Sequence, residues 1–337
     1  MTKIIAGALT ALAVLIAGAA ANADPVKIRV AWITVPTSLA PILFVKPELA
    51  PHLGKTYTLE PQRFAGSSAM TTALAAGDLD IAELSYSSFG YALQNARMDD
   101  LRVIADEIQD GLEGYSINYM VLKDSPVKTI EDLKGKVLAT NVIGTGTDIG
   151  MRAMMRKHGL ENKRDFTIIE SNYANMKPLL IGHKADLVTM ILAYEDDEVR
   201  QVARPLFRLR DIMGVTQILM LAARAPFIET NHAALVDYME DYLRSLHWYM
   251  NPANHTEVVS IVANFNKEPT SRYEPWLLTK ADQYRDPNAR PNLDAMQRNL
   301  QMQKEFGFLK TDIDVKSHAD LSIVEAAAKR LEAQSGN

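Results

Sequence analysis

Two turns rich in glycine and hydroxyl residues have the composition best suited to holding a small anion. Gly66-Ser67-Ser68 and Gly144-Thr145-Gly146 each come directly before a segment with the composition of a helix. The first backbone N–H groups of a helix have no partner within that helix, and the helix dipole places partial positive charge at the same end. Each turn could therefore bind an anion through main-chain amides and nearby hydroxyls.

The first turn also has a purely structural explanation. Serine is a favourable N-cap, so Ser67 could begin the helix predicted over 69–76 without any ligand, and Gly77 suits the end of that helix. A short apolar strand is predicted next, over 81–84, and it ends in the hydroxyl-bearing pair Ser85-Tyr86. In open α/β sheets ligands bind at the carboxyl ends of strands, so both explanations remain open.

The second turn is similar to a dinucleotide-binding loop but has different spacing. In the segment Gly144–Gly150 the third glycine lies one residue too late for G-x-G-x-x-G. A flexible turn and an anion-binding helix start both fit this composition. Asp148 weakens the second explanation, because a carboxylate in the first helical turn repels an anion unless its side chain points away. Whether Asp148, Arg63 or Lys184 faces a ligand is left open.

Aromatic and hydroxyl residues near other predicted strand ends complete the candidate site. A planar or aliphatic ligand packs well between aromatic rings, although a single aromatic residue more often belongs to the core or to a rim. We predict no catalytic residue. The predicted ligand-binding residues are Trp32, Thr34, Gly66, Ser67, Ser68, Ser85, Tyr86, Gly144, Thr145, Gly146, Thr189 and Tyr194.

The composition argues against metal, cofactor and nucleic-acid binding. The chain has no cysteine, and its seven histidines include no pair at i, i+4 on one predicted helix, so we expect no zinc site. The net charge of −5 is unlike that of nucleic-acid-binding proteins, which normally carry a basic face. We therefore expect no metal, no cofactor and no nucleic acid.

The first 23 residues are typical of a secretory signal peptide. Lys3 precedes an uncharged apolar run over 4–20, and Ala21-Asn22-Ala23 fits a cleavage site. A membrane anchor is the alternative, but the run is short and Asp24-Pro25 is no positive stop signal. We expect cleavage after Ala23 and a periplasmic protein. Because it lacks cysteine, it would have no lipid anchor and no disulfide, so a hydrophobic core must hold it together.

Apolar strand segments alternate with helical segments along the chain, which predicts an α/β fold. A stripe of apolar residues at helical spacing between 235 and 249 is expected to be core packing. We predict two lobes after the signal peptide of residues 1–23. The first lobe comprises 24–118 and 223–337, and the second comprises 119–222. The predicted strands lie at 28–32, 56–60, 81–84, 101–105, 117–122, 137–141, 166–170 and 187–191, with 206–209 as a further candidate. The apolar segment 216–222 is expected to lead back to the first lobe.

Two motifs carry a resemblance to a known family. The Gly66-Ser67-Ser68 turn is followed by ALAAGDLDIA over 73–82, and DLKGKV over 132–137 precedes the second turn and a helix ending near His158-Gly159-Leu160. The chain resembles the solute-binding proteins of ABC importers in the sulfonate, nitrate and taurine group, within the thiamine-pyrimidine-synthase-like superfamily. The likeness covers nearly the whole chain after the signal peptide.

This resemblance implies a two-lobed periplasmic binding protein fold of type II. Each lobe would be a mainly parallel sheet flanked by helices, with the ligand cleft between the lobes. In the resembled family the loop at Gly144 faces that cleft, and Thr145 stands at the position of a family serine. Asp148 departs from the family pattern.

The implied function is that of a monomeric receptor. It would capture a small organic anion, a sulfonate or a carboxylate, by lobe closure and deliver it to the permease of an ABC importer, touching the membrane only through that transporter. An enzyme of the same fold and a ligand sensor for a membrane kinase are the alternatives. The related enzymes use a cysteine-bearing motif or a cysteine nucleophile, which this chain lacks; the sensor is not separated from the importer receptor.

Overall fold

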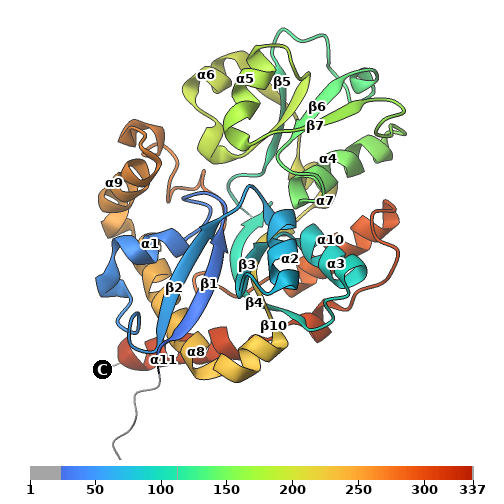
Figure 1. The fold of residues 1–337 in the computed structure, drawn as a ribbon. Helices are drawn as coiled ribbons and strands as arrows, with labels where there is room; N and C mark the ends of the chain where they lie inside the picture. The colour runs from blue at the N-terminus through green and yellow to red at the C-terminus, as the bar shows by residue number, and fades with distance from the viewer. Residues whose placement is uncertain (1–23, 112, 336–337) are drawn as a thin grey trace, which may run out of the picture.

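The computed structural model describes residues 24–111 and 113–335, which form two lobes (Figure 1). The predicted signal peptide, residues 1–23, lies outside the described residues. None of the helices described is both long enough and apolar enough to cross a membrane.

The first lobe is built on a five-stranded sheet with the order β2-β1-β3-β10-β4. The pairs β1–β2 and β1–β3 are parallel, whereas β10 runs antiparallel to both β3 and β4. The strands of this sheet are β1 (Val26–Trp32), β2 (Tyr57–Arg63), β3 (Ile81–Leu84), β4 (Leu101–Asp110) and β10 (Thr216–Arg224).

The second lobe repeats this arrangement with the order β7-β6-β8-β5-β9. Here β6 pairs in parallel with β7 and β8, and β5 runs antiparallel to β8 and β9. The strands are β5 (Asn118–Leu122), β6 (Val137–Thr140), β7 (Thr167–Glu170), β8 (Leu187–Met190) and β9 (Ala203–Arg208). The predicted two-lobed α/β fold is confirmed, but each sheet is mixed, because the strand that enters from the other lobe runs against its neighbours.

Helices flank both sheets (Figure 1). In the first lobe these are α1 (Ala40–Val45), α2 (Ser67–Ala76), α3 (Tyr86–Ala96), α8 (Ala225–Met250), α9 (His255–Asn266), α10 (Leu293–Glu305) and α11 (Ser322–Ser335). In the second they are α4 (Gly146–Lys157), α5 (Met176–Ile181), α6 (Asp197–Val202) and α7 (Leu209–Met213). Short 3-10 helices lie at Pro47–Leu49, Glu131–Leu133, Tyr173–Asn175, Leu192–Tyr194, Pro252–Asn254, Thr270–Arg272 and Val315–His318.

Helix α8 supplies much of the core of the first lobe. The apolar stripe predicted on it is buried: Leu235, Tyr238, Met239, Tyr242, Leu243, Leu246 and Tyr249 are at most 2% exposed. Burying each of these large side chains contributes roughly 1.5–3 kcal/mol relative to an exposed position. The core prediction for this segment is confirmed.

The chain crosses between the lobes at two glycine-containing segments. The first joins β4 to β5, and the second joins α7 to β10. A Cβ on Gly111 would lie 2.9 Å from the carbonyl oxygen of Gly214, so glycine at 111 lets the two segments pack closely. We propose that the lobes divide at these crossings, consistent with the sequence-based division into 24–118 with 223–337 and 119–222, except that β10 already belongs to the first sheet from Thr216.

Gly114, in the first crossing, should be much less tolerant of substitution than an open glycine. Its φ is +70°, and an added Cβ would lie 2.2 Å from the main-chain oxygen of Asp282. We expect Gly114→Ala to destabilise the protein by at least about 3 kcal/mol, from left-handed strain plus a backbone clash.

The matched control is Gly135→Ala, where φ is +79° and nothing lies within 4 Å of the added carbon. It should cost only about 1–2 kcal/mol, from the backbone conformation alone. The midpoint of urea unfolding, followed by circular dichroism, measures both. Equal costs for the two variants would show that the crossing moves freely away from Asp282.

Candidate ligand-binding site

A small cavity of about 50 Å³ lies between the lobes and is lined by residues of both. Six aliphatic residues form part of its wall: Ile33, Ile108, Ile117, Ile191, Ile218 and Leu219. Its polar lining is Thr34, Thr37, Ser67, Ser85, Asn141, Thr145, Gly146, Thr147, Tyr173 and Gln283. Among the described residues that line it there is no Lys, Arg, Asp or Glu, so its lining carries no formal charge.

The starts of α2 and α4 reach this cavity from opposite lobes. The N-cap of α2 is Gly66, which has no side chain, and the N-cap of α4 is Thr145, whose side chain makes no capping bond. The Thr145 hydroxyl instead donates to the main-chain oxygen of Val142 at 2.8 Å. Both helix starts therefore lack a side-chain cap and can accept an outside partner for their amides.

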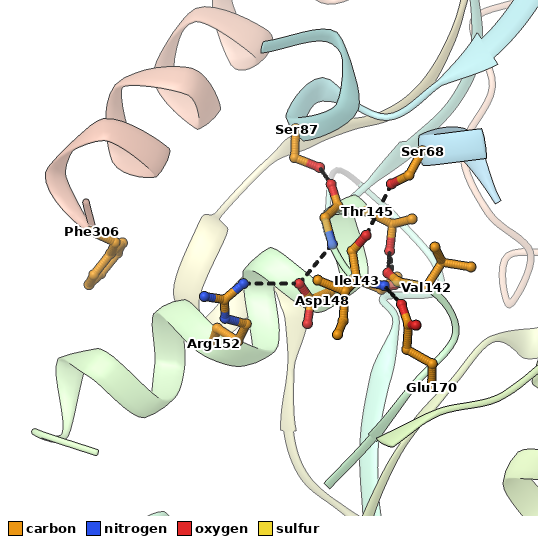
Figure 2. A network of polar contacts seen from close by, with 12 residues as sticks. Ser68, Ser87, Val142, Ile143, Thr145, Asp148, Arg152, Glu170 and Phe306 are labelled. Atoms are coloured by element: carbon orange, nitrogen blue, oxygen red, sulfur yellow. Dashed lines mark hydrogen bonds and ion pairs between the residues drawn. The ribbon is translucent and has the colours of Figure 1, made fainter. Parts of the chain in front are cut away.

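Asp148, in the first turn of α4, bonds back to the loop that precedes this helix. Its Oδ2 accepts a hydrogen bond from the Gly144 amide at 2.9 Å and lies 3.4 Å from Nη1 of Arg152 (Figure 2). The side chain is fully buried, and this burial raises the pKa of Asp148. Asp148 is not among the described residues that line the cavity, so its carboxylate acts as an internal cap on the loop, directed away from a ligand.

The same loop is bonded to the first lobe (Figure 2). The Ser68 hydroxyl donates to the oxygen of Ile143 at 3.1 Å, and that of Ser87 donates to the oxygen of Gly144 at 2.9 Å. The Gly146 amide donates to Ser85 Oγ at 3.1 Å. These hydrogen bonds join residues of the first lobe to residues of the second. The lobes are therefore in a closed arrangement.

A cluster of serine hydroxyls sits on the first-lobe side of this contact. Ser67 Oγ lies 2.8 Å from Ser88 Oγ and 3.2 Å from Ser85 Oγ, and all three residues are at most 2% exposed. Ser85 is the N-cap of α3 and accepts from the Ser88 amide at 3.2 Å. Hydroxyls rotate to donate or accept, so this cluster can redirect its protons toward a guest in the cavity.

A groove outside the cavity continues its lining, and we call it the mouth groove. It is walled by Trp32, Arg63, Phe64, Tyr173, Tyr194 and Arg272. Ile33, Thr34 and Tyr173 line both the groove and the cavity, so the two are adjacent. The guanidinium of Arg63 lies 5.3 Å from the centre of the Trp32 ring, within cation–π range.

The loop at 33–39, which lines both spaces, rests on buried charged residues. Ser38 Oγ accepts from the Ile33 amide at 3.0 Å and donates to Glu83 Oε2 at 2.8 Å. The Leu39 amide donates to Glu107 Oε1 at 2.9 Å. Arg285 donates to the main-chain oxygens of Pro36 at 2.5 Å and Thr37 at 2.6 Å, so one cation and two carboxylates hold the loop in place.

Burial dominates the electrostatics of this support. Glu83 and Glu107 are each 1–2% exposed. Burial and the neighbouring charge of Glu107 raise the pKa of Glu83, and burial raises the pKa of Glu107 against the opposing effect of Arg285. The pair therefore retains protons more readily than two exposed glutamates would.

The predicted ligand residues fall into four groups. Thr34, Ser67, Ser85, Thr145 and Gly146 line the cavity, and Trp32 and Tyr194 line the mouth groove. Gly66, Ser68 and Gly144 lie at the contact between the lobes, where a Cβ on Gly66 would come 3.1 Å from Val142. Tyr86 and Thr189 are fully buried: the Tyr86 hydroxyl donates to Gly146 O at 3.3 Å, and that of Thr189 to Ala139 O at 3.2 Å.

The structure also places the three charged residues whose orientation the sequence left open. Arg63 faces the mouth groove, Lys184 is exposed and is not among the residues that line the cavity or the groove, and Asp148 caps the loop as described. Cavity residues that the sequence analysis missed include Asn141, Thr147, Tyr173 and Gln283. Asn141 directly follows β6, so its position at a strand end was a usable signal, whereas nothing local to Gln283 places it near the cavity.

A possible metal-ligand group lies apart from this site. His52, Asp237 and Glu240 offer ligand atoms within 4.8 Å of one another. Arg330 pairs with Asp237 at 2.7 Å, and Arg244 pairs with Glu240 at 2.6 Å. Because both carboxylates already have cationic partners, this group is explained as an ion-pair network.

Comparison with known protein families identifies the chain. The model of the family described as NMT1/THI5 like matches residues 59–255, more than half of the chain. This chain belongs to the NMT1/THI5-like family. No match was found among curated proteins.

Solved structures share the fold of this NMT1/THI5-like protein. The nitrate-binding protein NrtA from Synechocystis PCC 6803 has a TM-score of 0.70 and 17% identity over 92% of this chain and 90% of its own. The alkanesulfonate-binding protein SsuA from Xanthomonas axonopodis pv. citri, bound to MOPS, has a TM-score of 0.68 and 16% identity, covering 89% and 99%. The resemblance to periplasmic binding proteins seen in the sequence motifs is confirmed.

An enzyme also shares this fold. The desulfurization enzyme DSZB has a TM-score of 0.59 and 13% identity, covering 91% of this chain and 99% of its own. Fold similarity at this level of identity does not transfer an activity in either direction.

The buried glutamates of this NMT1/THI5-like protein should make its stability fall as pH rises. Both carboxyls have a raised pKa, so the folded state binds more protons than the unfolded state above the unfolded value of about 4.3. Glu83→Gln keeps an acceptor for Ser38 and removes one of these protons. We expect the loss of unfolding free energy between pH 5 and pH 8 to be smaller in Glu83→Gln than in the wild type.

Urea unfolding at the two pH values measures this difference. Glu305→Gln, an exposed position at the end of α10, is the matched control and should keep the wild-type pH dependence. An equal or steeper pH dependence in Glu83→Gln would contradict the account of the support beneath the loop.

Proposed function

We propose that this protein is a periplasmic receptor that captures a small organic anion between its two lobes and delivers it to an ABC importer. One observation carries the proposal. The starts of α2 and α4, neither with a side-chain cap, reach one cavity from opposite lobes. A ligand that needs contacts from both lobes binds the closed form best, and so stabilises closure.

The uncharged polar lining supports an anion held by the main chain. In the closed arrangement the Gly146 amide donates to Ser85 Oγ, a neutral acceptor. An oxyanion in the cavity would replace this hydroxyl as the acceptor, and hydrogen bonds to a charged acceptor are roughly twice as strong. The aliphatic wall favours a guest with an organic body, such as a sulfonate or a carboxylate.

The neighbours support the importer role and the periplasmic location. Periplasmic sulfonate-binding and nitrate-binding proteins share this fold over about nine tenths of the chain. We infer a monomer that is exported with cleavage after Ala23 and that meets the membrane only at its transporter, with a permease as its protein partner and neither nucleic acid nor cofactor. We also infer that it is not an enzyme, since the chain has no cysteine to serve as the nucleophile of the related enzymes.

A thermal-shift screen of the mature protein tests the proposal, with sulfonates, carboxylates, nitrate and bicarbonate as probes. A ligand at 100 times its Kd stabilises the folded state by about 2.7 kcal/mol. At roughly 2 °C per kcal/mol for a chain of this size, the melting temperature should rise by about 5 °C. No shift with any of these anions would exclude the receptor function.

Thr145→Asp should abolish the shift. An aspartate at the N-cap satisfies the first amides of α4 itself and repels an anion, and it is a favourable cap, so the free protein should remain folded. Thr311→Asp, at an exposed position outside the site, is the control and should respond like the wild type. An undiminished shift in Thr145→Asp would remove the start of α4 from the site.

A further inference from the structure

Arg63 lines the mouth groove at the point that adjoins the cavity, and like Lys267 it has no carboxylate partner among the described residues. Among the described residues no Asp or Glu oxygen lies within 4.0 Å of its guanidinium, whereas Arg272, on the same groove, pairs with Glu268 at 2.7 Å. Arg63 uses only Nε, which donates to the oxygen of Ile33 at 3.2 Å. Its two terminal nitrogens are therefore available for an external acceptor.

The surroundings of Arg63 suit a flat ligand body. Its guanidinium lies over the Trp32 ring on the first lobe, and Tyr173 and Tyr194 of the second lobe stack on each other with ring centroids 6.2 Å apart. Trp32 and Tyr194 line the same groove. Aromatic faces on both sides of a groove favour a planar group between them.

The charge of the two spaces differs. No cation is found among the residues described as lining the inner cavity, which offers amides and hydroxyls, while the mouth groove carries Arg63, Lys267 and Arg272 against one acid, Glu268. The spaces adjoin at Ile33, Thr34 and Tyr173. A ligand that fills the cavity and is longer than an inorganic oxyanion must extend toward this positively charged groove.

We propose that Arg63 selects an elongated organic dianion with a planar middle. One anionic end would bind at the helix starts inside the cavity, the planar part would pass between the aromatic residues, and the other anionic end would bind the free nitrogens of Arg63. A carboxylate can accept two parallel hydrogen bonds from a guanidinium, which adds both geometry and strength. This inference rests on the receptor function proposed above and names its ligand class.

The test compares two probes that differ only in the second charge. Benzenesulfonate and 4-sulfobenzoate are titrated into the mature protein, residues 24–337, by isothermal calorimetry. We expect 4-sulfobenzoate to bind at least about tenfold more tightly, the value of one charge-assisted contact. Arg63→Gln should remove this preference, so that the two probes bind with similar affinity.

Arg298→Gln is the matched control. It removes the same charge from an exposed position on α10, away from the groove, and should retain the wild-type preference. Arg63→Lys should recover only part of the preference, because an ammonium cannot make the paired contact.

The outcomes separate this inference from the receptor function. If both probes bind equally well, or if Arg63→Gln weakens both to the same extent, the assignment of Arg63 is wrong while the receptor function stands. If neither probe binds but another anion of the thermal-shift screen does, the dianion class is likewise wrong. If no anion of either experiment binds, the receptor function fails and this inference fails with it.

Discussion

The polar main chain at the start of a helix must find partners outside that helix, and the site of this protein is organised around that requirement. Helices α2 and α4 begin at the boundary between the lobes, and neither has a side-chain cap. In the closed arrangement Ser85 of the other lobe accepts from the Gly146 amide at the start of α4. Ser68 and Ser87 add bonds between the lobes by donating to carbonyl oxygens of the preceding loop. The Gly146 amide thus bonds across the two lobes, and in the function proposed above it would bind the ligand.

Buried charged residues hold one wall of the cavity in place. The loop at 33–39 contributes to both the cavity and the mouth groove, and Glu83, Glu107 and Arg285 fix it from below. Burying two carboxylates beside one guanidinium lowers stability unless each is well bonded. Glu83, Glu107 and Arg285 each form hydrogen bonds to the loop. These bonds offset part of the cost of burial and fix the positions of the residues that line the cavity.

Asp148 is an acidic residue close to the proposed anion site, and its orientation makes the two compatible. A carboxylate in the first turn of α4 would repel an anion if it faced the cavity. It turns instead toward the Gly144 amide and Arg152 (Figure 2). It is not among the described residues that line the cavity. Asp148 therefore orders the loop without placing a negative charge in the cavity, while Thr145 and Gly146 of the same segment line the cavity.

Local patterns in the sequence determined the alternation of strands and helices, the core stripe of α8 and the two turns at Gly66 and Gly144, because periodicity and helix-start chemistry depend on near neighbours. They also led to Thr34, Ser67, Ser85, Thr145 and Gly146, which the structure brings together at one cavity. Only the tertiary structure decided that Tyr86 and Thr189 are buried, that Gln283 reaches the cavity and that Arg63 faces the mouth groove. Those outcomes depend on how two lobes, each made from distant segments, pack against one another, and no short stretch of sequence contains that information.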